Sequence, residues 1–118
     1  LLQSILPPLT VGCSVISLSD NASVLALKFA EDINNSDLPS GVLNMMSGNF
    51  ELIHEDVSKH VEINLISIHS SINDEILKNI EENASLSVKR VKHLPSNEGL
   101  SSILPYLETK TVWHPKGT

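Results

Sequence analysis

The sequence predicts an α/β fold with three layers, in which helices cover both faces of a mainly parallel sheet and a separate strand follows at the C-terminus. Short runs rich in Val, Ile and Leu alternate with segments whose apolar residues recur every three or four positions. Strands that alternate with helices pair in parallel, because each crossover helix returns the chain to the same end of the sheet. The chain has 118 residues, which is enough for one compact domain with its own core.

The first part of the chain predicts a helix, a strand, a helix and a strand. The expected elements are the end of a helix at 1–9, a strand at Val11–Leu18, a helix from about Ala22 to Asn34 and a strand at Val42–Ser47. Pro7 and Pro8 should prevent the first helix from being continuous. In the second helix Leu25, Phe29 and Ile33 recur every four residues, so we expect them to form its buried face.

The second part of the chain repeats this alternation. The expected elements are a short helix from Asn49 to about Glu55, a strand at Val61–His69, a helix from Ser71 to about Asn83, a strand at Leu86–Leu94, a short link broken by Pro105 and a last strand at Leu107–Trp113. Ser71 and Asp74 have the spacing of a capping box at a helix start. Ile72, Ile76 and Ile80 should line the buried face of that helix.

Composition and charge exclude several classes of function. The net charge is −6 and aromatic residues make up 3% of the chain, so a phosphate-backbone binder or a base-stacking platform is not expected. No apolar run reaches the length of a membrane span, and no signal peptide is visible. We therefore expect a cytoplasmic protein that binds neither nucleic acid nor membrane.

Three phrases resemble the aldehyde dehydrogenase superfamily. "DLPSGVLNMMSG" (37–48) resembles the family phrase GLPPGVLNVVTG, "HEDVSKHV" (54–61) resembles HPDVDKI, and "YLETKTVW" (106–113) resembles the closing strand YLEVKTV. The resemblance implies a Rossmann-like cofactor-domain core over residues 1–105, followed by a closing oligomerisation strand and tail over residues 106–118. In the family that strand adds to the sheet of a neighbouring subunit.

The resemblance also identifies the positions that would hold the adenosine ribose of NAD. The family places a Lys-Pro-Ser-Glu turn after the first of these strands, and the matching residues here are Leu18, Ser19, Asp20 and Asn21. A ribose diol is held by a cation and a charged acceptor. Leu18 offers neither, and Asn21 offers one uncharged acceptor, so this part of the nucleotide site is eroded.

The pyrophosphate element is eroded as well. The family carries Phe-Thr-Gly-Ser-x-x-x-Gly, whose glycines allow a helix N-terminus to approach the phosphates closely. The matching stretch is Ile66–Asp74, in which His69 stands near the glycine position and no second glycine follows. Asp74 and Glu75 in the first helical turn would repel a phosphate. We therefore expect no cofactor, and no confident cofactor-binding residue is assigned.

No catalytic residue is assigned either. After the fourth strand, where the family continues into its catalytic glutamate and cysteine segments, this chain passes directly to the closing strand. Cys13 occupies the family's Asn position at the start of a buried strand, where an apolar setting makes a thiol inert. We expect a structural cysteine and no catalysis by this chain alone.

The histidines and the basic residues have ordinary interpretations. None of the five histidines, at positions 54, 60, 69, 93 and 114, has the spacing of a helical zinc site, so no metal is expected. Lysines protect exposed strand edges from aggregation, and the basic cluster Val88–Lys92 is therefore interpreted as an edge strand in preference to an anion site.

These observations leave three hypotheses. The first is a non-catalytic aldehyde-dehydrogenase-like domain for oligomerisation or protein interaction, such as the tail of a long member with a degenerate second unit. Its partner would be a second copy or a fused or associated dehydrogenase subunit, contacted by Leu107, Thr109, Thr111, Val112 and Trp113. The alternative is a fragment of an active NAD(P)-dependent dehydrogenase that oxidises an aldehyde to a carboxylic acid. The third is a flavodoxin-like domain that holds an anion at Ser67–Ser71.

Overall fold

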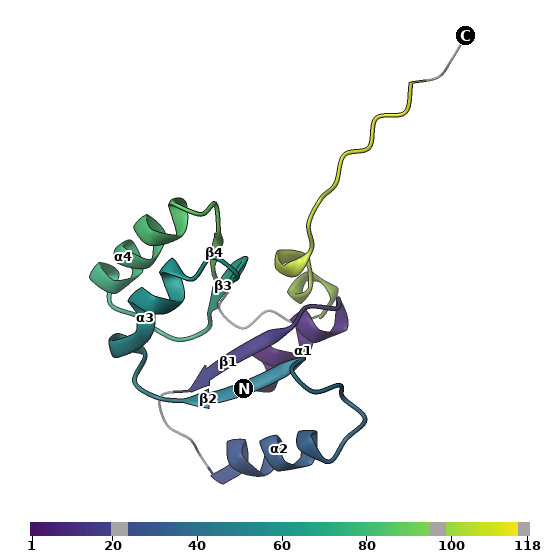
Figure 1. Cartoon of the computed structure of the whole chain (residues 1–118), viewed down its shortest axis with the longest axis vertical. Coiled ribbons are helices and arrows are strands. Elements are labelled where there is room, and N and C mark those ends of the chain that lie inside the picture. The colour runs from purple at the N-terminus through teal and green to yellow at the C-terminus, as the bar shows by residue number, and fades with distance from the viewer. Residues whose placement is uncertain (20–23, 95–98, 116–118) are drawn as a thin grey trace.

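The computed structural model describes residues 1–19, 24–94 and 99–115, and it is a mixed α/β structure (Figure 1). The elements in chain order are α1 (Leu2–Thr10), β1 (Val15–Ser19), α2 (Val24–Asn34), β2 (Leu43–Ser47), α3 (Phe50–Lys59), β3 (Leu65–Ile68), α4 (Asp74–Ser85), β4 (Arg90–His93) and the short 3₁₀ helices η1 (Gly99–Ser102) and η2 (Leu104–Tyr106). The alternation of helices with parallel strands confirms the expected fold class.

The strands form two separate parallel pairs instead of one continuous sheet. β1 pairs with β2, with Val15 opposite Leu43, and β3 pairs with β4, with Leu65 opposite Arg90. A doubly wound sheet has the strand order 3-2-1-4-5. Without its strand 1, such a sheet consists of the pairs 3-2 and 4-5, which correspond to β2–β1 and β3–β4. One further parallel strand between β1 and β3 would therefore complete a continuous sheet.

The core lies in the second half of the chain, between the β3–β4 pair and the helices α3 and α4 (Figure 1). Ile66 and Ile68 alternate along β3 and so point to the same face, where they pack with Ile80 of α4. Ile80 is only 1% exposed. Partly buried apolar residues surround this cluster, namely Phe50, Val57, Ile63, Ile72, Ile76, Leu77 and Val91. The expected apolar face of the helix with Ile72, Ile76 and Ile80 is thus confirmed.

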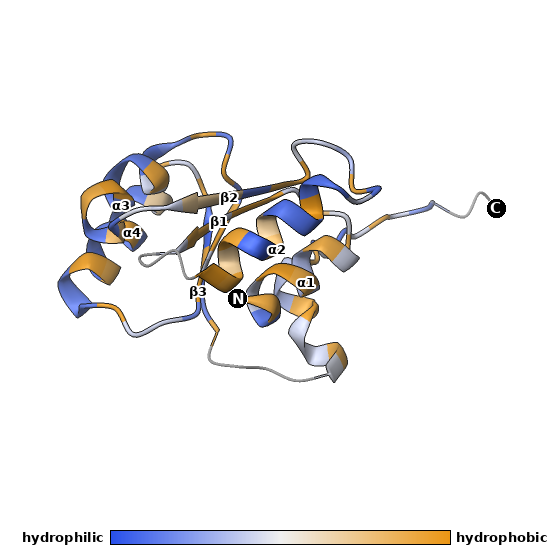
Figure 2. Ribbon diagram, turned by 90° about the horizontal axis from the view of Figure 1, so that it is seen from below, coloured by the Kyte–Doolittle hydropathy of each residue, from blue (hydrophilic) through white to orange (hydrophobic). Residues whose placement is uncertain are grey.

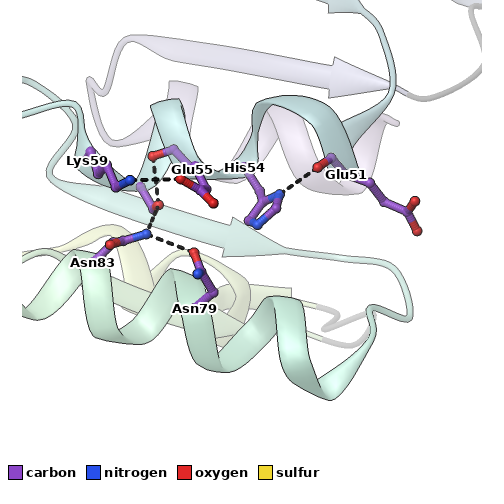
Figure 3. A network of polar contacts seen from close by, with 7 residues as sticks. Glu51, His54, Glu55, Lys59, Asn79 and Asn83 are labelled. Carbon is purple, nitrogen blue, oxygen red and sulfur yellow. Dashed lines mark hydrogen bonds and ion pairs between the residues drawn. The ribbon is translucent and has the colours of Figure 1, made fainter.

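A buried polar contact joins α3 to α4 (Figure 3). Ser58 is fully buried, and its Oγ donates to the Glu55 carbonyl at 3.0 Å and accepts from Asn83 Nδ2 at 3.1 Å. The second proton of that amide goes to Asn79 Oδ1 at 2.8 Å. On the outer side of α3, Lys59 Nζ lies 2.8 Å from the Glu55 carboxylate, which lowers the pKa of Glu55 and raises that of Lys59. The helix pair is therefore fixed by both apolar packing and satisfied polar groups.

The apolar face of α2 is mostly exposed, contrary to the sequence expectation. Leu25 is 73% exposed and Leu27 is 60% exposed, while Phe29 and Ile33 are half-buried and Ala26 is buried. Figure 2 shows orange, hydrophobic segments along α2. Periodicity shows that a helix has an apolar face, but a second element must cover that face, and none in the described part of the chain covers this one.

Several boundaries differ from the sequence expectation. α4 begins after Asn73, whose side chain accepts from the Glu75 N–H at 2.9 Å, so the expected capping box of Ser71 and Asp74 is wrong. α3 begins after a similar cap at Asn49 and continues to Lys59, one turn beyond the expected end. The expected strands at Val61–His69 and Leu86–Leu94 are reduced to their C-terminal residues, because turns occupy their first halves.

The first helix continues through both prolines, so the expected interruption is wrong. Pro7 and Pro8 lie inside α1, where each removes one backbone donor. Ile5 is fully buried and Pro8 is buried on the same helix. The Pro8 carbonyl also accepts the N–H of Cys13 at 3.0 Å. Burial and this terminal bond offset the two missing helical hydrogen bonds.

Candidate functional site

The short helix η2 connects the two halves of the chain. Tyr106 is buried, and its hydroxyl lies 3.3 Å from Nε2 of His69, which follows β3. The Tyr106 carbonyl accepts a weak hydrogen bond from Sγ of Cys13 at 3.9 Å. Cys13 is half-buried and precedes β1, so its expected place at the start of a buried strand is wrong.

Arg90 anchors the segment that leaves η2. Its Nη1 donates to the carbonyl oxygens of Pro105 and Leu107, at 3.3 Å and 3.0 Å. Its Nη2 lies 3.8 Å from the carboxylate of Glu108, which forms a partly exposed ion pair. The chain therefore leaves the domain at a fixed position next to β4.

Beyond this anchor, residues 107–115 extend away from the domain (Figure 1). They are exposed, with Val112 at 69% and Trp113 at 83%, and they pair with no strand of the described residues. The expected last strand at Leu107–Trp113 is thus not formed within this chain. A strand requires a neighbouring strand, and the five residues expected to make oligomer contacts have no strand neighbour among the described residues.

The expected cofactor positions lie apart in the structure. Leu18 lies opposite Met46 near the carboxyl end of β1 and is half-buried. His69 directly follows β3 in the other half of the chain and contacts Tyr106. Asp20 and Asn21 lie outside the described residues. Leu18 and His69 both lie at the carboxyl ends of parallel strands, where α/β sheets bind ligands. Neither side chain supplies a charged group for a ribose or a fixed donor for a phosphate.

The electrostatics around His69 and α4 do not favour a phosphate there. Burial is the main cause that lowers the pKa of His69, and the charge of His93 acts in the same direction. The imidazole therefore tends to be neutral. Asp74 and Glu75 occupy the first turn of α4, as the sequence predicts, and they oppose an anion at that helix end.

The described residues form no cluster of three His, Cys, Asp or Glu side chains that could hold a metal ion. His54 instead places Nδ1 2.8 Å from the Glu51 carbonyl, one turn earlier in α3 (Figure 3). No helix in the described part of the chain is long and apolar enough to cross a membrane.

A polar cavity of about 500 Å³ lies where β4 begins and the C-terminal segment leaves the domain. It is lined by Asn64, Ser87, Val88, Lys89, Arg90, Leu107, Glu108 and Thr109. Lys89 is only 9% exposed, which the sequence analysis did not anticipate. The sequence signal was the basic cluster Val88–Lys92, for which the edge-strand interpretation was preferred. The edge-strand interpretation agrees with the structure, because among the described residues β4 pairs with β3 and with no other strand.

The parallel strand pairs with their crossover helices form a Rossmann-like fragment, and comparison with known proteins identifies its family. Residues 1–95 match the family model for the aldehyde dehydrogenase family, so the chain belongs to that family. Over 85 residues it is 32% identical to a lactaldehyde dehydrogenase of Methanococcus maripaludis strain C7 and 29% identical to that of strain S2. Each alignment covers 68% of this chain and 18% of the relative.

A solved structure gives the same result. The crystal structure of an aldehyde dehydrogenase from Bartonella henselae superposes with a TM-score of 0.63 and 34% sequence identity. The match covers 74% of this chain and 18% of that one. The chain therefore spans less than a fifth of the length of the dehydrogenases that it matches.

Proposed function

We propose that this chain is a non-catalytic aldehyde-dehydrogenase-like unit that acts in oligomerisation or protein interaction in the cytoplasm. The observation that carries the proposal is the C-terminal segment, residues 107–113, which is extended, exposed and without a strand neighbour in the described residues. The partner is a second copy of the chain or a fused or associated dehydrogenase subunit.

The segment interacts by adding a strand to the sheet of its partner. In an extended conformation alternate residues share a face, so Leu107, Thr109, Thr111 and Trp113 lie on one side. Backbone hydrogen bonds supply affinity in this mode, and the side chains on one face supply specificity. Arg90 holds the Leu107 carbonyl at 3.0 Å, so the segment starts from a fixed point and loses less freedom on binding.

The expected cofactor positions support a non-catalytic role. Leu18 has no charge for a ribose, and His69 replaces a glycine beside a helix whose first turn carries two acids. We therefore propose that the unit acts without NAD(P) and without a metal.

Proline substitution in the segment tests the strand addition. Thr111→Pro and Val112→Pro each remove one backbone N–H, and because successive N–H groups point to opposite edges, one of the two must face the partner. By light scattering coupled to size exclusion, we expect the wild-type chain to assemble and one proline variant to be monomeric. Val112→Thr keeps the N–H and a β-branched side chain, so it should assemble normally. Unchanged sizing of both proline variants, or a monomeric wild-type chain, would refute self-association.

A second candidate is that the chain is part of an active NAD(P)-dependent aldehyde dehydrogenase, which oxidises an aldehyde to a carboxylic acid. It is favoured by the names of the relatives, which are lactaldehyde dehydrogenases, and by the 18% of their length that is covered. The intact mass of the native polypeptide, with peptide sequencing, distinguishes a mass near 12.9 kDa from a longer chain that carries a catalytic cysteine. Calorimetric titration of that native protein with NAD and NADP then decides, since micromolar binding would favour the enzyme.

A further inference from the structure

Lys89 is a largely buried lysine whose side chain has no acidic partner among the described residues. It is 9% exposed, and its Nζ donates to Oγ of Ser87. The ion pairs of the described residues involve other cations, and the nearest of these in sequence joins Arg90 to Glu108 at 3.8 Å. Buried charges in proteins are normally paired or bound to a ligand of opposite charge.

The local structure compensates this charge only in part. The backbone N–H of Lys89 donates to the Ala84 carbonyl at 3.0 Å, so the residue lies next to the C-terminal end of α4. A helix C-terminus carries the equivalent of about half a negative charge, and its effect falls off within the last turn. The Ser87 hydroxyl adds one neutral acceptor. A full counter-charge is absent from these contacts.

Hydrogen-bond donors and a second cation surround the same cavity. Arg90, Asn64 and Thr109 line it together with Lys89 and Ser87. The adjoining Val88 has a φ of +55°, a left-handed conformation that is rare for a β-branched residue. This conformation closes the C-terminal end of α4, since the Lys89 N–H donates back to the Ala84 carbonyl. The cavity itself combines two cations with polar donors.

We propose that this cavity binds a small oxyanion, either a phosphate or a carboxylate group, between the ammonium of Lys89 and the guanidinium of Arg90. The protein as a whole carries a net charge of −6, which disfavours anions, so binding depends on this local arrangement. The Glu108 carboxylate lies at the cavity and 3.8 Å from Arg90, where it competes with the ligand. The cavity shares Leu107, Glu108 and Thr109 with the segment proposed above to add to a partner sheet, but the anion site is argued from Lys89 and Arg90 and requires no partner.

The test is a calorimetric and NMR titration of the whole chain with sodium phosphate and, in a separate arm, sodium acetate, each against sodium chloride of equal ionic strength. We expect Lys89→Gln to weaken binding about tenfold or more, since it removes a charge-assisted contact. Lys92→Gln is the matched control, because Lys92 is exposed on β4, three residues after Lys89, and carries the same charge. It should change affinity by less than about twofold. Glu108→Gln should tighten binding, because the competing carboxylate is gone.

Each outcome decides the proposal. Binding of phosphate alone, of acetate alone or of both, with loss in Lys89→Gln and retention in Lys92→Gln, supports it and identifies the class of oxyanion. Equal weakening by the two lysine variants, or no effect of either anion beyond that of chloride, overturns it. If Lys89→Gln does not fold, as judged by circular dichroism, the ammonium resonance of Lys89 in the wild-type chain decides: a shift with added anion supports the site, and none overturns it.

Discussion

The turn that follows α4 allows a prediction in the direction of higher stability. Val88 has a φ of +55°, at a position where helices commonly end with glycine. Its left-handed conformation allows the N–H of Lys89 to donate back to the Ala84 carbonyl at 3.0 Å, which closes the helix end. Replacing Val88 with glycine keeps this bond and removes the strain of the Cβ atom.

The expected size of the effect follows from three terms. A left-handed conformation costs an L-residue roughly 1–2 kcal/mol. Glycine gives the unfolded chain more conformational freedom, which lowers the stability gained from the relieved strain by about 0.4–1 kcal/mol. Because the Val88 side chain is 90% exposed, its removal loses little burial. We therefore expect Val88→Gly to raise the free energy of unfolding by about 0.5–1 kcal/mol, or the Tm by roughly 2–6 °C.

Urea denaturation followed by circular dichroism, together with a thermal scan, measures this difference. Val88→Ala is the control, because alanine removes the same exposed methyl groups but keeps the Cβ atom. We expect it to change stability much less than glycine does. A glycine variant that is less stable than wild type, or an alanine variant that is stabilised equally, would show that the strain at Val88 is not the cause.

Three further predictions concern the core, the helix interface and pH. Ile80→Ala should lower the free energy of unfolding by about 2–5 kcal/mol in urea denaturation, because the side chain is 1% exposed, whereas Leu52→Ala, at 78% exposure, should cost less than about 0.5 kcal/mol. Ser58→Ala should cost about 1 kcal/mol in the same assay, since it removes the hydroxyl that links α3 to α4; no change would mean that the contact is not stabilising. Burial lowers the pKa of His69 in the folded state below its ordinary value of 6.5, so the unfolded chain takes up a proton more readily and stability should fall as the pH drops below about 6.5. Denaturation midpoints measured across this pH range should fall less in His69→Asn than in the wild-type chain. In the exposed control His114→Asn they should fall as much as in the wild-type chain. Equal pH profiles for the two variants would contradict the assignment.

The periodicity of the sequence predicted the existence and order of the elements from α1 to β4, because apolar spacing is a local property. It also predicted a strand at Leu107–Trp113, which is not formed among the described residues. Their ends were less predictable. The stretch from Ser71 to Asp74 offers several possible caps, and the choice of Asn73 depends on where the helix docks against the sheet. The alternating pattern from Leu86 to Lys89 is equally compatible with a strand and with the turn that the structure contains.

Features that depend on distant parts of the chain were missed. Leu25 belongs to a regular apolar stripe, yet it is 73% exposed, since nothing in its own sequence specifies the neighbour that should cover it. Lys89 is part of a basic cluster that is typical of an exposed strand edge. In the structure it is nevertheless only 9% exposed and lines the cavity beside the start of β4. The interpretation of the cofactor positions as eroded stays a prediction from residue types alone, since Leu18 carries no charge and His69 is not a glycine.

The division of the strands into two pairs has a consequence for how the molecule opens. Each pair is closed by its own crossover helix, and the buried apolar cluster belongs to the second pair. In hydrogen exchange, the amide protons of β3 and α4 should then have opening free energies close to the global free energy of unfolding. The amide protons of β1 and α2 should exchange through smaller, local unfolding events. The buried Tyr106, which touches Cys13 on one side and His69 on the other, is where the first unit can separate from the second. An added strand between β1 and β3 would join these units into one cooperative unit.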